Sequence, residues 1–207
     1  SYEKNKLTVS SLDLLPRTTL AQSMDVLSSM ASLAGYRAVI KAAALFNGIL
    51  PMFTTAAGTI TPAKVLILGA GVAGLQALAT AERLGAITCA MDIRPDAIEQ
   101  AKSLGAKVIE TGIPAEIAVG KGGYAKKLSD EWILKEREEI SKVIKNMDVI
   151  FLSALVPGKI APILITEDMV KEMKNGSVIV DVSIDQGGNC EITTPGVKEV
   201  KHNITIN

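Results

Sequence analysis

The sequence has few aromatic residues, one histidine, two cysteines and no excess of either charge. Aromatic residues make up only 3% of the 207 residues although 48% are hydrophobic, so the core must be built from Ala, Val, Ile and Leu. That composition is typical of an α/β protein. Basic and acidic residues both number 22, and this balance gives no long-range field that would attract nucleic acid. We therefore expect no nucleic-acid partner.

Membrane and secretion signals are also lacking. The longest uncharged apolar stretch is residues 65–81, which is shorter than the ~20 residues of a membrane span. We therefore expect no direct membrane insertion by this chain. No charged segment followed by an apolar one marks a secretory signal at the start. Cys89 and Cys190 are too few for a disulfide framework and fit a reducing compartment.

Residues 64–79 are the segment around which the chain is organised. An apolar run of strand length meets Gly69, Gly71 and Gly74 and continues into an alanine-rich helical pattern. This G-x-G-x-x-G spacing is that of a dinucleotide site. The first glycine would form the tight turn, the second would let backbone approach a pyrophosphate, and the third would let the helix pack on the strand. The pyrophosphate would lie at the helix N-terminus, beside Val72 and Ala73.

Asp92 follows the next predicted strand, residues 87–91, close to the ~20 residues beyond the glycines that the dinucleotide pattern requires. A carboxylate there would accept both ribose hydroxyls and repel a 2′-phosphate. The pattern therefore predicts NAD(H) and not NADP(H) as the cofactor of this chain. Ile93 and Arg94 complete this part of the predicted site.

The rest of the sequence predicts alternating strands and helices, hence a Rossmann-type doubly wound parallel sheet with an N-terminal remnant of a second α/β domain. Further strands are expected at residues 7–15, 107–110, 149–152 and 177–182, and helices at 28–46, 95–104, 129–145 and 166–175. Ser28 or Ser29, Ser129 and Thr166 are the expected N-caps. No metal site is predicted.

The predicted domain boundaries are 1–27, 28–63 and 64–207, and the glycine-rich residues 112–128 are expected to form a mobile loop. The carboxyl ends of the strands would bring Asp92, 153–159 and 183–189 to one edge of the sheet. Because the sequence starts without Met and stops at strand-like residues 203–207, both ends are interpreted as cut.

Candidates for acid–base catalysis are scarce. A dehydrogenase acting on an alcohol or amino acid must move a proton as well as a hydride. The only histidine, His202, lies near the C-terminus with no obvious partner in the sequence. Hydride transfer between two nicotinamides moves no accompanying proton, so this composition is compatible with nucleotide-to-nucleotide transfer. Lysines are abundant, and they leave a dehydrogenase open.

Several motifs together resemble the NAD(H)-binding component, called domain I of the alpha subunit, of proton-translocating nicotinamide nucleotide transhydrogenase. They are Pro16-Arg17, Ala21-Gln-Ser-Met-Asp25, Leu27-Ser-Ser29, Leu33-Ala-Gly-Tyr-Arg37, Thr55-Ala-Ala-Gly58, the glycine turn, Gly122-Gly-Tyr-Ala-Lys126, Ala154-Leu-Val-Pro-Gly-Lys159, Met173-Lys-Asn-Gly-Ser177 and Gly187-Gly-Asn189. The resemblance spans essentially the whole chain.

The resemblance implies site residues that spacing does not give. Arg17, Asp25 and Ser28 would hold the nicotinamide end of NAD(H), and Gln22 would reach the NADP(H) of a partner; we group these four as catalytic. The loop with Gly122 and Tyr124 would close over the bound nucleotide. Ala154 and Leu155 would complete the cofactor site.

The resemblance also implies direct hydride transfer between NAD(H) and NADP(H), coupled to proton translocation in the intact enzyme. The partners would be an NADP(H)-binding component, a membrane-spanning component and a second copy of domain I. The complex would lie at the cytoplasmic face of a bacterial inner membrane or the matrix side of an organellar one. Residues 184–187 are similar to those of alanine dehydrogenases, so an NAD-dependent alanine dehydrogenase remains an alternative, as does a non-catalytic nucleotide-binding module.

Overall fold

A computed structural model describes residues 3–12, 15, 18–120 and 123–207 of the chain. Its centre is a seven-stranded sheet in the order β5-β4-β3-β6-β7-β9-β8, in which only β8 runs antiparallel to its neighbour. Successive strands lie on either side of β3, which is the topology of a doubly wound sheet. The predicted Rossmann-type fold is confirmed.

The strands of the sheet are β3 (Lys64–Leu68), β4 (Ile87–Met91), β5 (Lys107–Val108), β6 (Val149–Leu152), β7 (Val178–Asp181), β8 (Glu199–Lys201) and β9 (Ile204–Ile206), and a separate hairpin pairs β1 (Phe53–Thr55) with β2 (Gly58–Ile60). The helices are α1 (Val26–Leu45), α2 (Val72–Arg83), α3 (Pro95–Ser103), α4 (Ala115–Ala118), α5 (Asp130–Ile144) and α6 (Glu167–Lys171), with 3-10 turns η1 (Glu3–Asn5), η3 (Gln22–Met24) and η5 (Ile184–Gln186).

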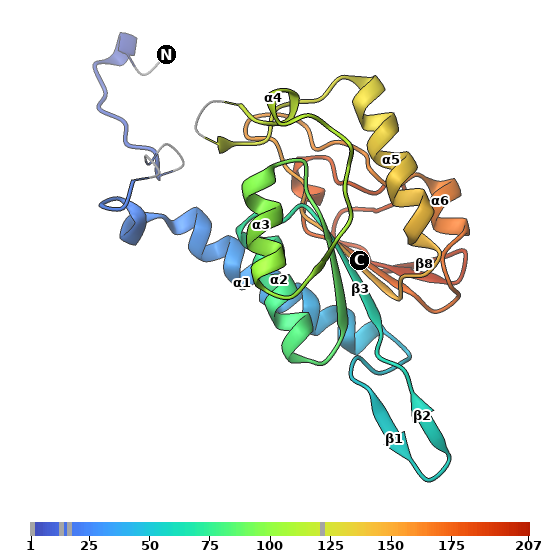
Figure 1. Ribbon diagram of the computed structural model, residues 1–207. Helices are drawn as coiled ribbons and strands as arrows, with labels where there is room; N and C mark the ends of the chain where they lie inside the picture. The colour runs from blue at the N-terminus through green and yellow to red at the C-terminus, as the bar shows by residue number, and fades with distance from the viewer. Residues whose placement is uncertain (1–2, 13–14, 16–17, 121–122) are drawn as a thin grey trace.

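Helices cover both faces of the sheet (Figure 1). One core cluster joins α1, α2 and α3 to the sheet, and a second joins α5 and α6 to the other face. The central strands β6 and β7 are buried along their whole length, because both of their faces are covered. Phe151 is the only aromatic residue among the buried core of the described chain, so small aliphatic side chains fill both layers as the composition predicts.

The helices α1 and α2 cross in close contact. A Cβ added to Gly35 of α1 would overlap the backbone carbonyl oxygen of Ala73, in the first turn of α2. Beside this crossing, the Ser32 hydroxyl donates a hydrogen bond to the Gln76 side chain at 3.2 Å. The earlier part of α1 and the described residues directly before it, 18–25, project from the sheet domain (Figure 1). The crossing therefore fixes where this projecting segment starts relative to the glycine turn.

The local predictions are confirmed for the strands of the sheet core, and several boundaries are wrong. The strand expected at residues 7–15 is absent from its described part, where Leu7, Val9 and Leu12 are exposed and no neighbouring strand offers a ladder. The connection at 51–63 contains the β1–β2 hairpin, which was missed. The helix expected to run to about residue 175 ends at Lys171.

The helix starts also differ from the predictions. Asp25, and neither Ser28 nor Ser29, caps α1, because its carboxylate accepts the Ser28 amide at 2.9 Å. Ser129 stands at the N-cap position of α5 but makes no side-chain capping bond. Thr166 caps α6 as predicted, by accepting the Met169 amide. In the part of the chain that the structure describes, no helix is long and apolar enough to cross a lipid bilayer.

Candidate nucleotide-binding site

The site lies at the carboxyl ends of β3 and β6, the neighbouring strands from which the chain winds in opposite directions. Ligands of open α/β sheets bind in the crevice at such a point. Gly69 leaves β3 with a φ of +90°, which a residue with a side chain adopts only with strain. Its carbonyl oxygen accepts a hydrogen bond from the Ser153 hydroxyl at 2.8 Å, and this bond joins the two strand ends.

The three glycines of the turn have different surroundings. A Cβ at Gly69 would lie 2.7 Å from the Ala154 amide nitrogen, and one at Gly74 would overlap the Gly69 carbonyl oxygen. A Cβ at Gly71 would meet only the Arg94 guanidinium, at 3.9 Å. Gly71 is the N-cap of α2, whose first amides have no acceptor within the helix. The open space therefore lies where a pyrophosphate would approach these amides, and the turn fits the phosphate group of a dinucleotide.

Asp92 is held by protein donors in this structure. One carboxylate oxygen accepts the Ala70 amide and Arg94 Nη2, both at 2.8 Å, and the other accepts the Arg94 amide at 2.8 Å and Nε at 3.0 Å. Asp92 is only 8% exposed. Its role toward the ribose hydroxyls stays a prediction. The structure adds that Arg94 forms an ion pair with the same carboxylate. Ile93, between them, is half-buried.

The predicted residues after β6 are held in place by Asn189. Its Oδ1 accepts the Ala154 amide at 2.9 Å, and its Nδ2 donates to the carbonyl oxygens of Ala154 at 2.9 Å and Pro162 at 2.8 Å. Asn189 has no exposed surface. Leu155, next along, is half-buried. One side chain thus fixes both backbone polar groups of Ala154.

Asn189, whose bonds to Ala154 we call the clamp, is held in turn by residues at the end of β7. The Asp181 carboxylate accepts the backbone amides of Asn189 at 2.7 Å and Cys190 at 3.1 Å, and also the Ser183 amide and hydroxyl. The Ser183 hydroxyl lies 2.8 Å from Asn189 Oδ1. Every member of this buried network has a partner, which makes the carboxyl edge rigid between β6 and β7.

The predicted nicotinamide residues lie at the start of α1. Asp25 accepts the Ser28 hydroxyl at 2.7 Å in addition to its amide, so these two predicted residues hold each other. Gln22 is exposed in η3, directly before the helix. Arg17 lies outside the described residues. The structure thus brings Gln22, Asp25 and Ser28 together on one turn of chain, while their contact with a nucleotide stays a prediction.

Tyr124 is half-buried and lines an open groove of about 440 Å³ with Lys126, Val156 and Lys159, among others. The groove lies between the predicted loop and the segment that follows β6. The loop is not without structure, since it contains α4 and an isolated bridge between Val119 and Ala125. Gly122 lies outside the described residues.

Comparison with known proteins agrees with this geometry. Residues 38–206 match the family model described as "Alanine dehydrogenase/PNT, C-terminal domain". The chain belongs to the alanine dehydrogenase/PNT family. It is 50% identical over 204 residues to the first part of the alpha subunit of NAD(P) transhydrogenase from Rhodospirillum rubrum, covering 98% of this chain and 53% of that protein. The predicted resemblance to the transhydrogenase component is confirmed.

Two further relatives, a transhydrogenase and an alanine dehydrogenase, show different degrees of similarity to this chain. The crystal structure of transhydrogenase from Sinorhizobium meliloti superposes with a TM-score of 0.81 at 45% identity, covering 95% of this chain and 52% of that one. Alanine dehydrogenase of Staphylococcus epidermidis is 33% identical over 174 residues, or 83% of this chain and 41% of that protein. The chain therefore spans about half the length of these relatives.

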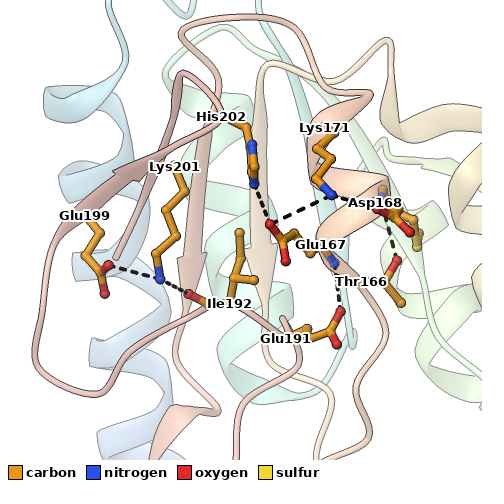
Figure 2. Close-up of polar contacts among 10 residues, drawn as sticks. Thr166, Glu167, Asp168, Lys171, Glu191, Ile192, Glu199, Lys201 and His202 are labelled. Atoms are coloured by element: carbon orange, nitrogen blue, oxygen red, sulfur yellow. Dashed lines mark hydrogen bonds and ion pairs between the residues drawn. The ribbon is translucent and has the colours of Figure 1, made fainter.

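His202 of this family member lies away from the candidate site. Because β9 runs parallel to β7, the turn before β9 lies at the amino end of the sheet. His202 has a partner that was not obvious from the sequence, since its Nε2 lies 2.7 Å from Glu167 Oε1 of α6 (Figure 2). Burial raises the pKa of both cysteine thiols, Cys89 and Cys190, so neither is a reactive thiolate.

Two residues near the site were missed by sequence reasoning. Asn189 was noted only as part of a motif, and its clamp on Ala154 bridges 35 positions that no local pattern connects. Glu136 of α5 is a buried charged residue, 6% exposed. One signal of Glu136 was available in the sequence, since it precedes the buried Ile140 and Ile144 at intervals of four. A charge at such a position lies on the core face of a helix.

Proposed function

We propose that this chain is the NAD(H)-binding part of an NAD(P) transhydrogenase, which transfers a hydride directly between NAD(H) here and NADP(H) on a partner component. The observation that carries the proposal is the open position at Gly71, between two tightly packed glycines, in a member of this family. Identity to the R. rubrum transhydrogenase subunit, 50% over 98% of the chain, exceeds that to the alanine dehydrogenase, 33% over 83%.

The chain's own residues would bind and orient the nucleotide. The first amides of α2 would hold the pyrophosphate, Asp92 and Arg94 would face the adenosine ribose, and Ala154 and Leu155 would line the path between them. NAD(H), when bound, supplies or accepts the hydride. Asp25 and Ser28 would hold the nicotinamide end, with Arg17 from the preceding segment.

The intact enzyme would couple this transfer to proton translocation through a membrane-spanning component, with a second copy of the NAD(H)-binding part as a further partner. Support comes from the R. rubrum relative, whose name describes a portion of one subunit of a larger enzyme. The cytoplasmic or matrix side of the membrane is the corresponding location. This aspect of the proposal rests on the relatives alone.

Shortening Gln22 tests the proposal. In the full-length protein, Gln22→Asn is expected to leave NADH affinity within about twofold, because Gln22 would contact the partner's nucleotide. The single-turnover rate of hydride transfer to NADP on the NADP(H)-binding component is expected to fall about 100-fold, since a ~1 Å displacement from the near-attack arrangement costs that much. Fluorescence titration and stopped-flow absorbance measure the two quantities.

Ser23→Ala, at the exposed neighbouring position of the same turn, is the matched control and should preserve the rate. Parallel loss of NADH binding and transfer in Gln22→Asn would place Gln22 in the NADH site and defeat the proposed role. Alanine-dependent reduction of NAD without any partner component would support the alanine dehydrogenase alternative. Nucleotide binding without either reaction would indicate a non-catalytic module.

The loop with Tyr124 gives a second test. Its backbone hydrogen bonds are internal, such as Gly120 N–H to the Tyr124 carbonyl at 2.8 Å and Lys126 N–H to that of Ala118 at 2.8 Å. Among the described residues, no backbone–backbone hydrogen bond joins this loop to the sheet, and backbone bonds of that local kind open at low free-energy cost. We expect fast amide hydrogen exchange of residues 112–128 without ligand and at least tenfold slower exchange with NADH. Strong protection in the ligand-free protein would contradict a closing loop.

A further inference from the structure

Glu136 occupies a core position on the face of the sheet opposite α2. It stands one helical turn before Ile140 and two before Ile144, both fully buried in the cluster that also contains Leu68 and Met91. The N-terminal part of α5 lies toward the carboxyl edge, since the helix ends at Ile144, shortly before β6 starts at the amino edge. Glu136 is therefore at the carboxyl edge on this face, and its carboxyl is close enough to Asp92, the residue after Met91, for the two to interact electrostatically.

The Glu136 carboxyl is buried without a partner. Among the residues that the structure describes, it makes no hydrogen bond and no ion pair. The only fully enclosed side-chain polar atom without a partner in that part of the chain is Thr193 Oγ1. The oxygens of Glu136 are also unpaired but are not fully enclosed, so the carboxyl keeps a small opening to solvent. A carboxylate in this position is costly to bury and gains nothing from the fold.

The charges around Glu136 come from the candidate site. Asp92 is the charged group that acts on it, and burial together with this neighbouring carboxylate raises the pKa of Glu136 to about 7. The Arg94 guanidinium is engaged with Asp92, in an ion pair of 2.8 Å. Arg137, next to Glu136 on α5, is turned to the Ile163 carbonyl oxygen, to which Nε and Nη2 donate at 2.8 and 2.6 Å. No described cation therefore pairs with Glu136.

The charges of Asp92 and Arg94 affect whether the site can bind the 2′-phosphate of NADP(H). A lone carboxylate at the end of β4 repels a 2′-phosphate, but here Arg94 neutralises the Asp92 carboxylate. An unopposed arginine at this position is the group that accommodates a 2′-phosphate in NADP-binding proteins. Asp92 and Arg94 together leave no net charge at this corner. Two further carboxylates then make the local field negative: Asp96 in the first turn of α3, which acts on Arg94, and the buried Glu136, which acts on Asp92 from the other side.

We propose that Glu136 is a specificity-determining residue of the nucleotide site, whose buried carboxylate behind the Asp92–Arg94 pair excludes the 2′-phosphate of NADP(H). The inference rests on the proposed function, because it needs the adenosine ribose at the end of β4. Glu136 acts through space on the 2′-phosphate, which NADP(H) carries in addition to the pyrophosphate. Discrimination increases as Glu136 ionises, so it is weaker below pH 7 and stronger above it.

Titration of NADH and NADPH on the full-length protein, by fluorescence at pH 6 and pH 8, tests this inference. In the parent protein the ratio of the Kd for NADPH to that for NADH is expected to increase with pH. In Glu136→Gln the ratio at pH 8 is expected to fall about tenfold, the order expected for a charge pair several ångströms apart near a protein surface. The remaining pH dependence of Glu136→Gln reports the 2′-phosphate itself, which ionises near pH 6.

Glu138→Gln is the matched control, since it makes the same change at an exposed position of α5 and should keep the parent ratio. Glu136→Leu matches the apolar positions that follow it and should lower the ratio as Glu136→Gln does, which separates charge from side-chain shape. Circular dichroism verifies that each variant is folded. A parent protein that does not bind NADH would overturn the proposed function and this inference with it. NADH binding with one ratio in all four proteins would overturn the inference alone.

Discussion

Gly74→Ala is expected to lower the free energy of unfolding by about 1–3 kcal/mol, the usual cost of forcing an extra carbon into a packed core. The added Cβ would overlap the Gly69 carbonyl oxygen and would lie 3.2 Å from Ile67 Cγ2. Because the main obstacle is backbone, α2 must move away from β3. The higher helix propensity of alanine, about 1 kcal/mol, offsets only part of this cost. Urea denaturation followed by circular dichroism measures the change.

Gly71→Ala is the matched comparison. Its Cβ has open space in the protein and the φ of −77° at Gly71 suits any residue, so the entropy gained by replacing glycine, about 0.4–1 kcal/mol, largely offsets the poorer N-cap, and stability should change by less than about 1 kcal/mol. The same methyl group would occupy the approach to the α2 amides. NADH affinity is therefore expected to fall at least tenfold, or about 1.4 kcal/mol. Equal stability of the two variants would refute the different roles of these glycines, and unchanged NADH affinity of Gly71→Ala would refute the phosphate position.

Glu136→Gln is expected to stabilise the protein at high pH and to have little effect at low pH. An unfolded glutamate ionises near its ordinary pKa of 4.5, whereas in the folded protein the pKa is raised to about 7. Below pH 4.5 the carboxyl is neutral in both states and costs nothing. Between pH 4.5 and 7 the unfolded state loses the proton first, and folded stability falls by up to about 3 kcal/mol. Above pH 7 the full cost is present.

Urea denaturation of the parent protein and Glu136→Gln at pH 5 and pH 8 measures this. The stability gain of the variant should be about 1–3 kcal/mol larger at pH 8 than at pH 5, the lower figure allowing for relaxation around the carboxylate. Glu138→Gln, on the exposed side of the same helix, should show no such pH-dependent gain. A gain of equal size at both pH values would mean that ionisation of the Glu136 carboxyl does not lower the free energy of unfolding.

A destabilising carboxylate next to a nucleotide site is consistent with a role in binding. Stability would favour an apolar residue at this position of α5, because Ile140 and Ile144 continue the same buried stripe. Functional sites are where such conflicts between local packing and chemistry are expected. Thermal stability and nucleotide discrimination are thus expected to change in opposite directions in Glu136→Gln.

The central part of the site could be predicted from the amino-acid residues alone. A strand, a turn with glycines at fixed spacing and a helix are specified by neighbouring residues: Gly69 needs a positive φ, and Gly74 leaves no room for a Cβ. The position of Asp92 at the end of the next strand follows from the same alternation. These features can be predicted from the sequence because each depends on local backbone conformation and on apolar residues that recur every two residues in strands and every 3.6 residues in helices.

The partners of the side chains became known only from the folded chain. Arg94 on the Asp92 carboxylate, Asn189 on both polar groups of Ala154 and Glu167 beside His202 are pairings that the residue pattern did not reveal. The failed strand at residues 7–15 belongs to the same class, since alternating residues form a strand only where a neighbour supplies the ladder. Partners, burial and hence the pKa of Glu136 depend on distances between segments far apart in sequence, which only the folded chain defines.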